Sequence, residues 1–234
     1  LQRRGDGDPD PAAGRAVIVY KSGRSPEGRG AASSHTASVA GDYPVCRSVL
    51  EQAGAVVCGD IEEYENMVRG FAALADKKPR GNRVGLLSNA GFECVVMADG
   101  LKPGEGLELA RLSRRTATAI AALLKPLGID RLQDVRNPLD LTPVADDAAF
   151  AGAVGLVLAD PGVDGAVVSP LPLTAALQTL PPSPEHAENI HDPRSVGQRL
   201  IEVLGRSPKP VVVNIDSGEL YDPLAGMLEI GEPV

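Results

Sequence analysis

Short β-branched runs that alternate with helical stretches constrain this chain more than any other feature. Five apolar runs have the composition of strands buried on both faces of a parallel sheet: residues 16–20, 55–58, 84–88, 165–169 and 211–215. Between them lie stretches with acidic first turns or apolar residues at helical spacing: residues 43–53, 60–75, 116–124 and 146–158. This alternation predicts an α/β fold with a doubly wound parallel sheet.

A charged segment containing Pro and Gly interrupts the alternation. We place a linker there, at residues 77–82, between a first domain at residues 1–76 and a second domain at residues 83–234. The first domain offers only two convincing strands, which are too few to cover both faces of a parallel sheet, so we expect it to be incomplete. Residues 179–193 are polar and rich in Pro, and we expect an excursion or lid there.

Charge and cysteine content argue against several classes of protein. The chain has 23 Lys and Arg against 31 Asp and Glu, whereas a nucleic-acid surface needs concentrated cations. No apolar run approaches the ~18 residues of a membrane span, so we expect neither nucleic acid nor membrane as a partner. Cys46, Cys58 and Cys94 lack the spacing of a zinc site or a disulfide framework. We therefore expect a cytoplasmic protein in which Cys58 and Cys94 are buried packing residues.

One cluster has the residue types of a metal site, but its setting argues against that role. His186, Glu188, His191 and Asp192 lie in the Pro-rich stretch, where no helix fixes their spacing. We expect a solvated loop there and no metal site.

A single histidine in a run of small residues is the candidate nucleophile. Residues 33–42 read Ser-Ser-His-Thr-Ala-Ser-Val-Ala-Gly-Asp, and we expect a loop in which His35 can be approached closely. An unperturbed imidazole has a pKa of about 6.5, so a neutral nitrogen is available near neutral pH. The hydroxyls of Ser34 and Thr36 could donate to a phosphate. A histidine that only forms a hydrogen bond in a surface loop is the alternative.

The end of the strand at residues 84–88 is the candidate receptor for an anion. If that strand runs straight into a helix, free backbone N–H groups and the helix dipole converge on one point. Ser88 or Asn89 can cap the helix, and Gly91 permits close approach of the backbone. An ordinary capped turn is the alternative. The four candidate phosphate-binding residues are Ser88, Asn89, Ala90 and Gly91.

Four stretches in family order closely resemble the NDP-forming acyl-CoA synthetases, relatives of succinyl-CoA synthetase. The first combines Val-Ile-Val-Tyr-Lys-Ser-Gly-Arg-Ser at residues 17–25 with Ser34-His35-Thr36. The second contains the Asn-Ala-Gly turn at residues 89–91. The third is Asn-Pro-Leu-Asp-Leu-Thr at residues 137–142, and the weakest is residues 158–164.

The resemblance implies two flavodoxin-like, succinyl-CoA synthetase-like domains, the first of them incomplete. It implies a component of an enzyme that converts an acid, CoA and a nucleoside triphosphate to acyl-CoA, nucleoside diphosphate and phosphate, with acetate or another small acid as substrate. In the family the histidine that matches His35 carries a phosphoryl group. An acyl phosphate phosphorylates the imidazole and releases the acid, and the phosphohistidine then passes the group to ADP.

The resemblance also implies which residues lie near the phosphohistidine. In the family the helix start that matches residues 88–91 meets the phosphohistidine, and the turn at Asn137 and Asp140 lies near the same edge of the sheet. Alone, Asn-Pro is a turn signal and Asp140 a helix cap. Phe92-Glu93 departs from the family's commoner pattern. A carboxylate beside a phosphate is unfavourable, so we expect Glu93 to point away, to cap the helix or to position the histidine.

CoA and ATP or ADP with Mg²⁺ are the cofactors that the resemblance implies for the complete enzyme, and we expect this chain alone to bind none of them. These residues contain neither the family's CoA-binding domain nor its ATP-grasp domain, and no Walker-type motif replaces them. We therefore expect part of an oligomeric synthetase, inactive alone, whose missing domains are supplied in cis or by another subunit. The alternative is a non-catalytic regulatory or interaction module, as in protein acetyltransferases that carry a related region.

Overall fold

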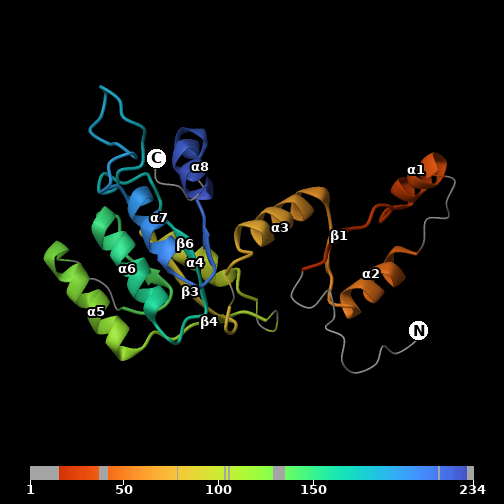
Figure 1. Cartoon of the computed structure of the whole chain (residues 1–234), viewed down its shortest axis with the longest axis horizontal. Helices are drawn as coiled ribbons and strands as arrows, with labels where there is room; N and C mark the ends of the chain where they lie inside the picture. The colour runs from red at the N-terminus through yellow and green to blue at the C-terminus, as the bar shows by residue number, and fades with distance from the viewer. Residues whose placement is uncertain are drawn as a thin grey trace. The chain divides into compact units, whose positions relative to one another are not determined.

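A computed structural model describes residues 16–36, 42–77, 79–102, 104, 106–128, 135–215 and 217–230, with the backbone alone at 33–36 and 230. The chain divides into two compact units, Leu1–Ala75 and Asp76–Val234 (Figure 1). No helix in the described ranges is long and apolar enough to cross a membrane.

The first unit combines two short parallel strands with three helices. Strand β1 (Ile18–Tyr20) pairs with β2 (Val56–Cys58), with Ile18 opposite Val56. The helices are α1 (Pro26–Thr36), α2 (Tyr43–Gln52) and α3 (Ile61–Ala73). Asp42 and Asp60 cap α2 and α3 by accepting the N–H groups of Val45 and Glu63. Both strands and both capped helices are at the positions that the sequence predicted.

Helix α1 corrects the expectation of a loop around His35. The backbone is helical as far as Thr36, so His35 lies in the last turn of α1. Two local signals favour this helix. The Ser25 hydroxyl oxygen accepts the N–H of Gly28 at 3.0 Å, and Pro26 occupies the first helical position, where its missing N–H costs nothing.

The second unit is built on a parallel sheet of five strands. The order is β4-β3-β6-β7, and β5 pairs with the end of β3. Every pairing is parallel, which confirms the parallel α/β architecture. The strands are β3 (Arg83–Ser88), β4 (Glu108–Leu109), β5 (Leu139–Asp140), β6 (Gly165–Ser169) and β7 (Val211–Val213).

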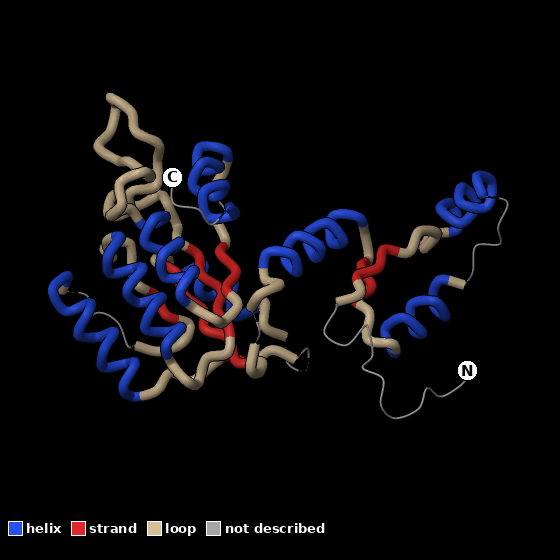
Figure 2. The backbone as a smooth tube through the Cα atoms, viewed as in Figure 1, coloured by secondary structure: helices blue, strands red, loops and turns tan. Residues whose placement is uncertain are grey.

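Helices α5, α6 and α7 pack side by side next to this sheet (Figures 1 and 2). They share one hydrophobic core with β3 and β6, in which Phe150 is fully buried beside Leu87 and Val168. Burying such side chains is the main stabilising contribution to this unit. The helices of the unit are α4 (Gly91–Asp99), α5 (Arg114–Leu124), α6 (Asp147–Ala159), α7 (Val196–Arg206) and α8 (Asp222–Ile230).

Residues 170–195, between β6 and α7, form an irregular excursion, as the sequence predicted for part of this segment. A buried carboxylate, Asp147, and a half-buried one, Glu188, hold it in place. The Oδ1 atom of Asp147, at the start of α6, accepts the N–H groups of Gln178 at 3.0 Å and Val196 at 2.6 Å. Within the excursion, Glu188 accepts the N–H of Thr179 at 2.7 Å. The excursion is therefore anchored to α6.

Candidate functional site

Polar side chains gather at the carboxyl edge of the five-stranded sheet. Ser88, Asp140 and Ser169 are the last residues of β3, β5 and β6, and Asn214 follows β7. Open α/β sheets bind ligands along this edge, because loops from several strands meet there. The edge is therefore the candidate site of the second unit.

Ser88 and Asn89 use their side chains within the protein. Both are fully buried. The Ser88 hydroxyl oxygen accepts the N–H of Ala90 at 3.1 Å. The Asn89 amide donates to the carbonyl of Leu171 at 3.0 Å and accepts the N–H of the same residue at 2.7 Å. These two side chains hold the turn after β3 and the start of the excursion.

Helix α4 begins without a side-chain cap. Its N-cap residue is Ala90, so the expectation that Ser88 or Asn89 caps the helix was wrong, because those side chains bond elsewhere. Side chains cap α2, α3, α5, α6 and α7. The start of α4 thus retains backbone N–H groups that no side chain caps.

The Asp140 carboxylate approaches this helix start. A Cβ atom built on Gly91 would lie 2.9 Å from the Oδ2 atom of Asp140, which explains why a glycine stands there. The other oxygen, Oδ1, accepts the N–H of Thr142 at 2.8 Å. A carboxylate near the positive end of a helix dipole is stabilised there. It also competes with any other anion for the same position.

Thr142 is strained and holds an unused polar atom. Its φ angle is +61°, a conformation that β-branched residues rarely adopt. Its Oγ1 atom is buried and has no hydrogen-bond partner in the described part of the chain. Strain of this kind concentrates at functional sites, so it supports the choice of this edge.

Glu93 connects α4 to the sheet. Its Oε2 atom accepts a hydrogen bond from the Ser169 hydroxyl at 3.2 Å, and Asn214 lies 3.5 Å from the same hydroxyl. Glu93 therefore does not cap α4, and its carboxylate turns toward the ends of β6 and β7.

Cys94, the next residue of α4, is no candidate nucleophile. Burial, with a smaller contribution from the negative charge of Asp140, raises the pKa of its thiol to about 11. The thiol therefore stays protonated at neutral pH. Burial of Cys94 and of Cys58 was predicted and is confirmed.

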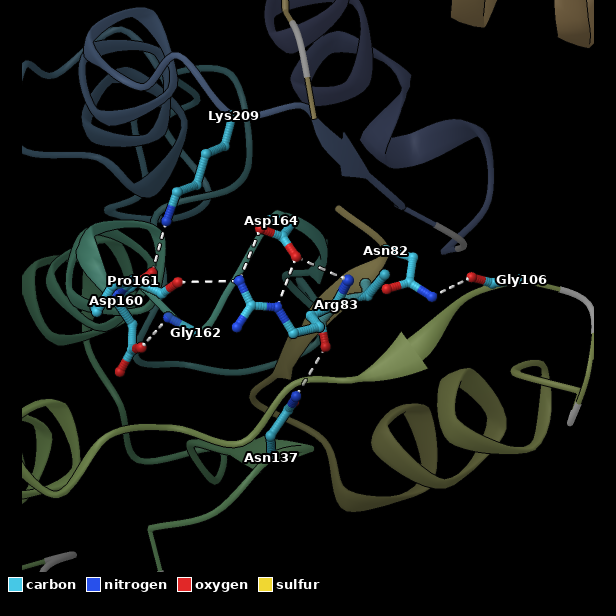
Figure 3. Close-up of polar contacts among 10 residues, drawn as sticks. Asn82, Arg83, Gly106, Asn137, Asp160, Pro161, Gly162, Asp164 and Lys209 are labelled. Atoms are coloured by element: carbon cyan, nitrogen blue, oxygen red, sulfur yellow. Dashed lines mark hydrogen bonds and ion pairs between the residues drawn. The ribbon is translucent and has the colours of Figure 1, made fainter. Parts of the chain in front are cut away.

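Asn137 completes the sheet between β3 and β4 (Figure 3). Its amide oxygen accepts the N–H of Leu86 at 2.8 Å, and its amide nitrogen donates to the carbonyls of Val84 at 2.8 Å and Ala110 at 2.9 Å. The side chain thus replaces a stretch of strand beside β3. All of these partners are backbone groups, so the amide is engaged in structure.

The opposite, amino edge of the sheet holds an ionic cluster (Figure 3). Its two acids, Asp160 and Asp164, belong to the stretch at residues 158–164 that resembles the family, but the sequence did not predict their pairing. Arg83 forms a bidentate pair with Asp164, with Nε 2.7 Å from Oδ2 and Nη2 3.0 Å from Oδ1. The hydrogen bond from Arg83 lowers the pKa of Asp164. Lys209 donates to the carbonyl of Asp160 at 2.7 Å. The cluster joins the starts of β3, β6 and β7, away from the candidate site.

The comparisons with known proteins agree with this architecture. Residues 11–71 match the model of the succinyl-CoA ligase like flavodoxin domain. The chain is 33% identical over 176 residues to the alpha subunit of ADP-forming acetate–CoA ligase II from Pyrococcus furiosus, covering 75% of the chain and 36% of that protein. It is 31% identical over 206 residues to the alpha subunit of ligase I from the same organism, covering 87% of the chain and 39% of that protein.

The chain is homologous to part of the ADP-forming acyl-CoA synthetases. A solved structure shows the same fold: the dinucleotide forming acetyl-coenzyme A synthetase 1 of Ca. Korarchaeum cryptofilum, in complex with phosphate and ADP. The TM-score is 0.70 at 24% identity, over 94% of this chain and 46% of that one. The chain thus spans less than two fifths of the two Pyrococcus subunits that it matches.

The two groups of predicted site residues lie in different units of the chain. His35 lies within residues 11–71, the span that matches the family model, and in the first unit. The turn at residues 88–91 belongs to the second unit, where the structure brings it together with Asp140 and Glu93. The described residues contain no group of three or more His, Cys, Asp or Glu that could hold a metal ion.

Proposed function

We propose that this chain is the phosphohistidine-bearing component of an NDP-forming acyl-CoA synthetase. One observation carries the proposal: His35, in its Ser-His-Thr motif, lies inside the region that matches the succinyl-CoA ligase like domain. The relatives of the chain are named as ADP-forming acid–CoA ligases. In the complete enzyme the overall reaction consumes an acid, CoA and a nucleoside triphosphate, and yields acyl-CoA, nucleoside diphosphate and phosphate.

His35 is the phosphoryl carrier of this reaction. In the direction of triphosphate synthesis, a neutral imidazole nitrogen attacks the phosphorus of an acyl phosphate, the acyl P–O bond breaks, and the acid leaves as a carboxylate. The terminal oxygen of a nucleoside diphosphate then attacks the phosphohistidine, the P–N bond breaks, and the imidazole is restored. Ser34 and Thr36, the neighbours of His35 in the motif, are the proposed supporting residues.

The start of α4 is the proposed receptor for the phosphoryl group. The backbone N–H groups after Ala90 have no side-chain cap, and they lie at the carboxyl edge of the sheet. Gly91 keeps this helix start open, and Ser88 and Asn89 fix the turn that leads into it. The carboxylates of Asp140 and Glu93 lie beside this helix start and limit how much negative charge it accepts. Asn137 holds β3, the strand that leads to this helix start, by donating to the carbonyl of Val84.

CoA, the nucleotide and Mg²⁺ bind, in this proposal, to CoA-binding and ATP-grasp domains outside these residues, in cis or in another subunit of an oligomer. Two of the relatives are named as alpha subunits, which supports a divided enzyme. Mg²⁺ would neutralise charge on the nucleotide phosphates. The three free cysteines favour a reducing, cytoplasmic setting. Acetate or another small acid is the proposed substrate.

The test separates the two half-reactions of the complete enzyme. Attack of inorganic phosphate on acyl-CoA does not need the imidazole, whereas delivery of the phosphoryl group to ADP does. His35→Asn should therefore abolish synthesis of ATP from acetyl-CoA, phosphate and ADP, while acetyl phosphate still forms at the wild-type rate. His191→Asn, an exposed histidine of the excursion, is the matched control and should retain both activities. Undiminished ATP synthesis by His35→Asn would rule the proposal out.

A further inference from the structure

A half-open cleft of about 490 Å³ lies beside the edge of the five-stranded sheet, away from the polar cluster at Ser169. Residues 109–112 and 135–137 line it. Its volume falls in the range of small-molecule sites. The hydrogen bond from Asn137 to the carbonyl of Ala110, at 2.9 Å, ties the two lining segments together. Because Arg111 and Arg136 each lie one residue from this bond, the structure holds two arginines at the same cleft.

Arginine is concentrated here although the chain as a whole is acidic, with a formal net charge of −8. Arg111, Arg114, Arg115 and Arg136 are exposed. In the part of the chain that the structure describes, no acidic group pairs with any of the four guanidinium groups, whereas the arginines at positions 47, 83, 194 and 206 all form ion pairs.

Two of these arginines lie at the start of α5, next to the lining segment at residues 109–112. Helix α5 begins with Arg114 and Arg115 and has no acid in its first turn, so two cations lie at the positive end of its dipole. The neighbouring acid, Asp160, is buried, and its two oxygens accept the N–H groups of Ser113 at 2.8 Å and Gly162 at 2.7 Å. In the described part of the chain this carboxylate is thus engaged with backbone N–H groups and forms no ion pair with the four arginines.

The remaining lining is apolar. Leu109 exposes 40% of its surface, and Leu112 and Val135 are partly buried against the core. Guanidinium groups recognise carboxylates and phosphates through paired N–H donors, and aliphatic walls favour an apolar body. The two kinds of lining thus select for a molecule that combines an anionic head with an apolar part.

We propose that this cleft binds a small organic anion, with its carboxylate or phosphate head on Arg111 and Arg136 and its apolar body against Leu109, Leu112 and Val135. Among the described residues, neither His35 nor any residue at the start of α4 lines the cleft. It therefore does not depend on the proposed phosphoryl transfer.

Calorimetric titration of the 234-residue chain tests the site with three probes: n-hexyl phosphate, hexanoate and inorganic phosphate. We expect one of the two hexyl probes to bind with 1:1 stoichiometry and at least about tenfold more tightly than inorganic phosphate, because the alkyl chain is buried. Which of the two binds better identifies the head group. Arg111→Gln and Arg136→Gln should each weaken that binding by about tenfold or more.

Matched variants locate the binding. Arg206→Gln removes an exposed arginine from α7 and should leave the affinity unchanged. Leu109→Ser should weaken binding of the hexyl probe and leave binding of inorganic phosphate unchanged. His35→Asn should not change the affinity of the chain for the probes, which separates this site from the proposed phosphoryl chemistry. Should the arginine variants fail to fold, the wild-type amide NMR signals of residues 109–112 and 135–137 must shift on titration.

Three results would overturn the proposal. One is the absence of binding by both hexyl probes. Another is an equal loss of affinity in Arg206→Gln and Arg111→Gln, which would show a response to net charge alone. The third is binding that leaves the NMR signals of both lining segments unmoved.

Discussion

The side chains of Asn89, which is fully buried, and Asn137, which is half-buried, take the place of backbone groups in the second unit. Each pairs with main-chain N–H and carbonyl groups, Asn89 at Leu171 and Asn137 between β3 and β4. An amide can replace a peptide group because it offers both a donor and an acceptor. Sequence alone marks both residues as turn or site residues, because their partners lie tens of positions away along the chain.

Replacing Asn137 should destabilise the second unit. Asn137→Ala leaves the N–H of Leu86 and the carbonyl of Ala110 without this partner. The carbonyl of Val84 loses one of two hydrogen bonds, since it also accepts the N–H of Ala110 at 2.9 Å. The loss costs about 2–3 kcal/mol. Asn137→Asp should be at least as damaging, since a carboxylate faces two carbonyl oxygens. Urea unfolding followed by circular dichroism measures the change. Asn214→Ala, which loses only a 3.5 Å contact, should stay within about 0.5 kcal/mol of the wild type. An equally small change for Asn137→Ala would contradict this role.

The thiol of Cys94 should react slowly and show an unusual pH dependence. Because its pKa is raised to about 11, little thiolate exists at pH 8, and the fraction keeps rising with pH beyond the point at which an ordinary thiol is fully ionised. In a Cys46→Ser, Cys58→Ser background, alkylation by iodoacetamide should therefore accelerate steadily between pH 8 and pH 10 in the folded protein. An alkylation rate that has reached its plateau by pH 10 would show that the thiol is not perturbed.

Among the elements, the sequence predicted the starts of α2 and α3 well. The start of α1 was its main error. Asp42 and Asp60 cap helices as their positions before acidic or apolar runs suggest. Ser25-Pro26-Glu27 carries the same signal for α1, but Gly28 and Gly30 favour a turn, and the segment around His35 was interpreted as a loop. In the structure the cap at Ser25 and the proline at position 26 prevail, and the backbone is helical as far as Thr36.

The excursion at residues 170–195 should open when its anchor on α6 is removed. Asp147→Ala deletes the acceptor of two N–H groups, those of Gln178 and Val196. Such bonds to a charged group are worth about 1.5–3 kcal/mol each, so opening should become at least about tenfold more frequent. Limited trypsin digestion followed by mass spectrometry should show faster cleavage after Arg194. Asp222→Ala, at the start of α8, is the control. Equal cleavage rates in the three proteins would refute the anchoring role.

For the whole molecule, the order of strands and helices followed from periodicity, because parallel strands and their covering helices have distinct hydrophobic patterns. The five long apolar runs all proved to contain strands, whereas β4 and β5, of two residues each, are too short to leave a pattern. The candidate site was only partly predictable. The turn at residues 88–91 was recognisable, but the approach of Asp140 to Gly91 and the contact between Glu93 and Ser169 depend on how the sheet aligns.

The central claim, that His35 carries a phosphoryl group, is tested most directly by labelling the complete enzyme. Incubated with triphosphate labelled at the γ-phosphate, the wild-type enzyme should yield a phosphoprotein that is labile to acid and stable to alkali, with the label on His35. His35→Asn should yield none, and the 234-residue chain alone should also remain unlabelled. Labelling of the His35→Asn enzyme at the wild-type level would contradict the account.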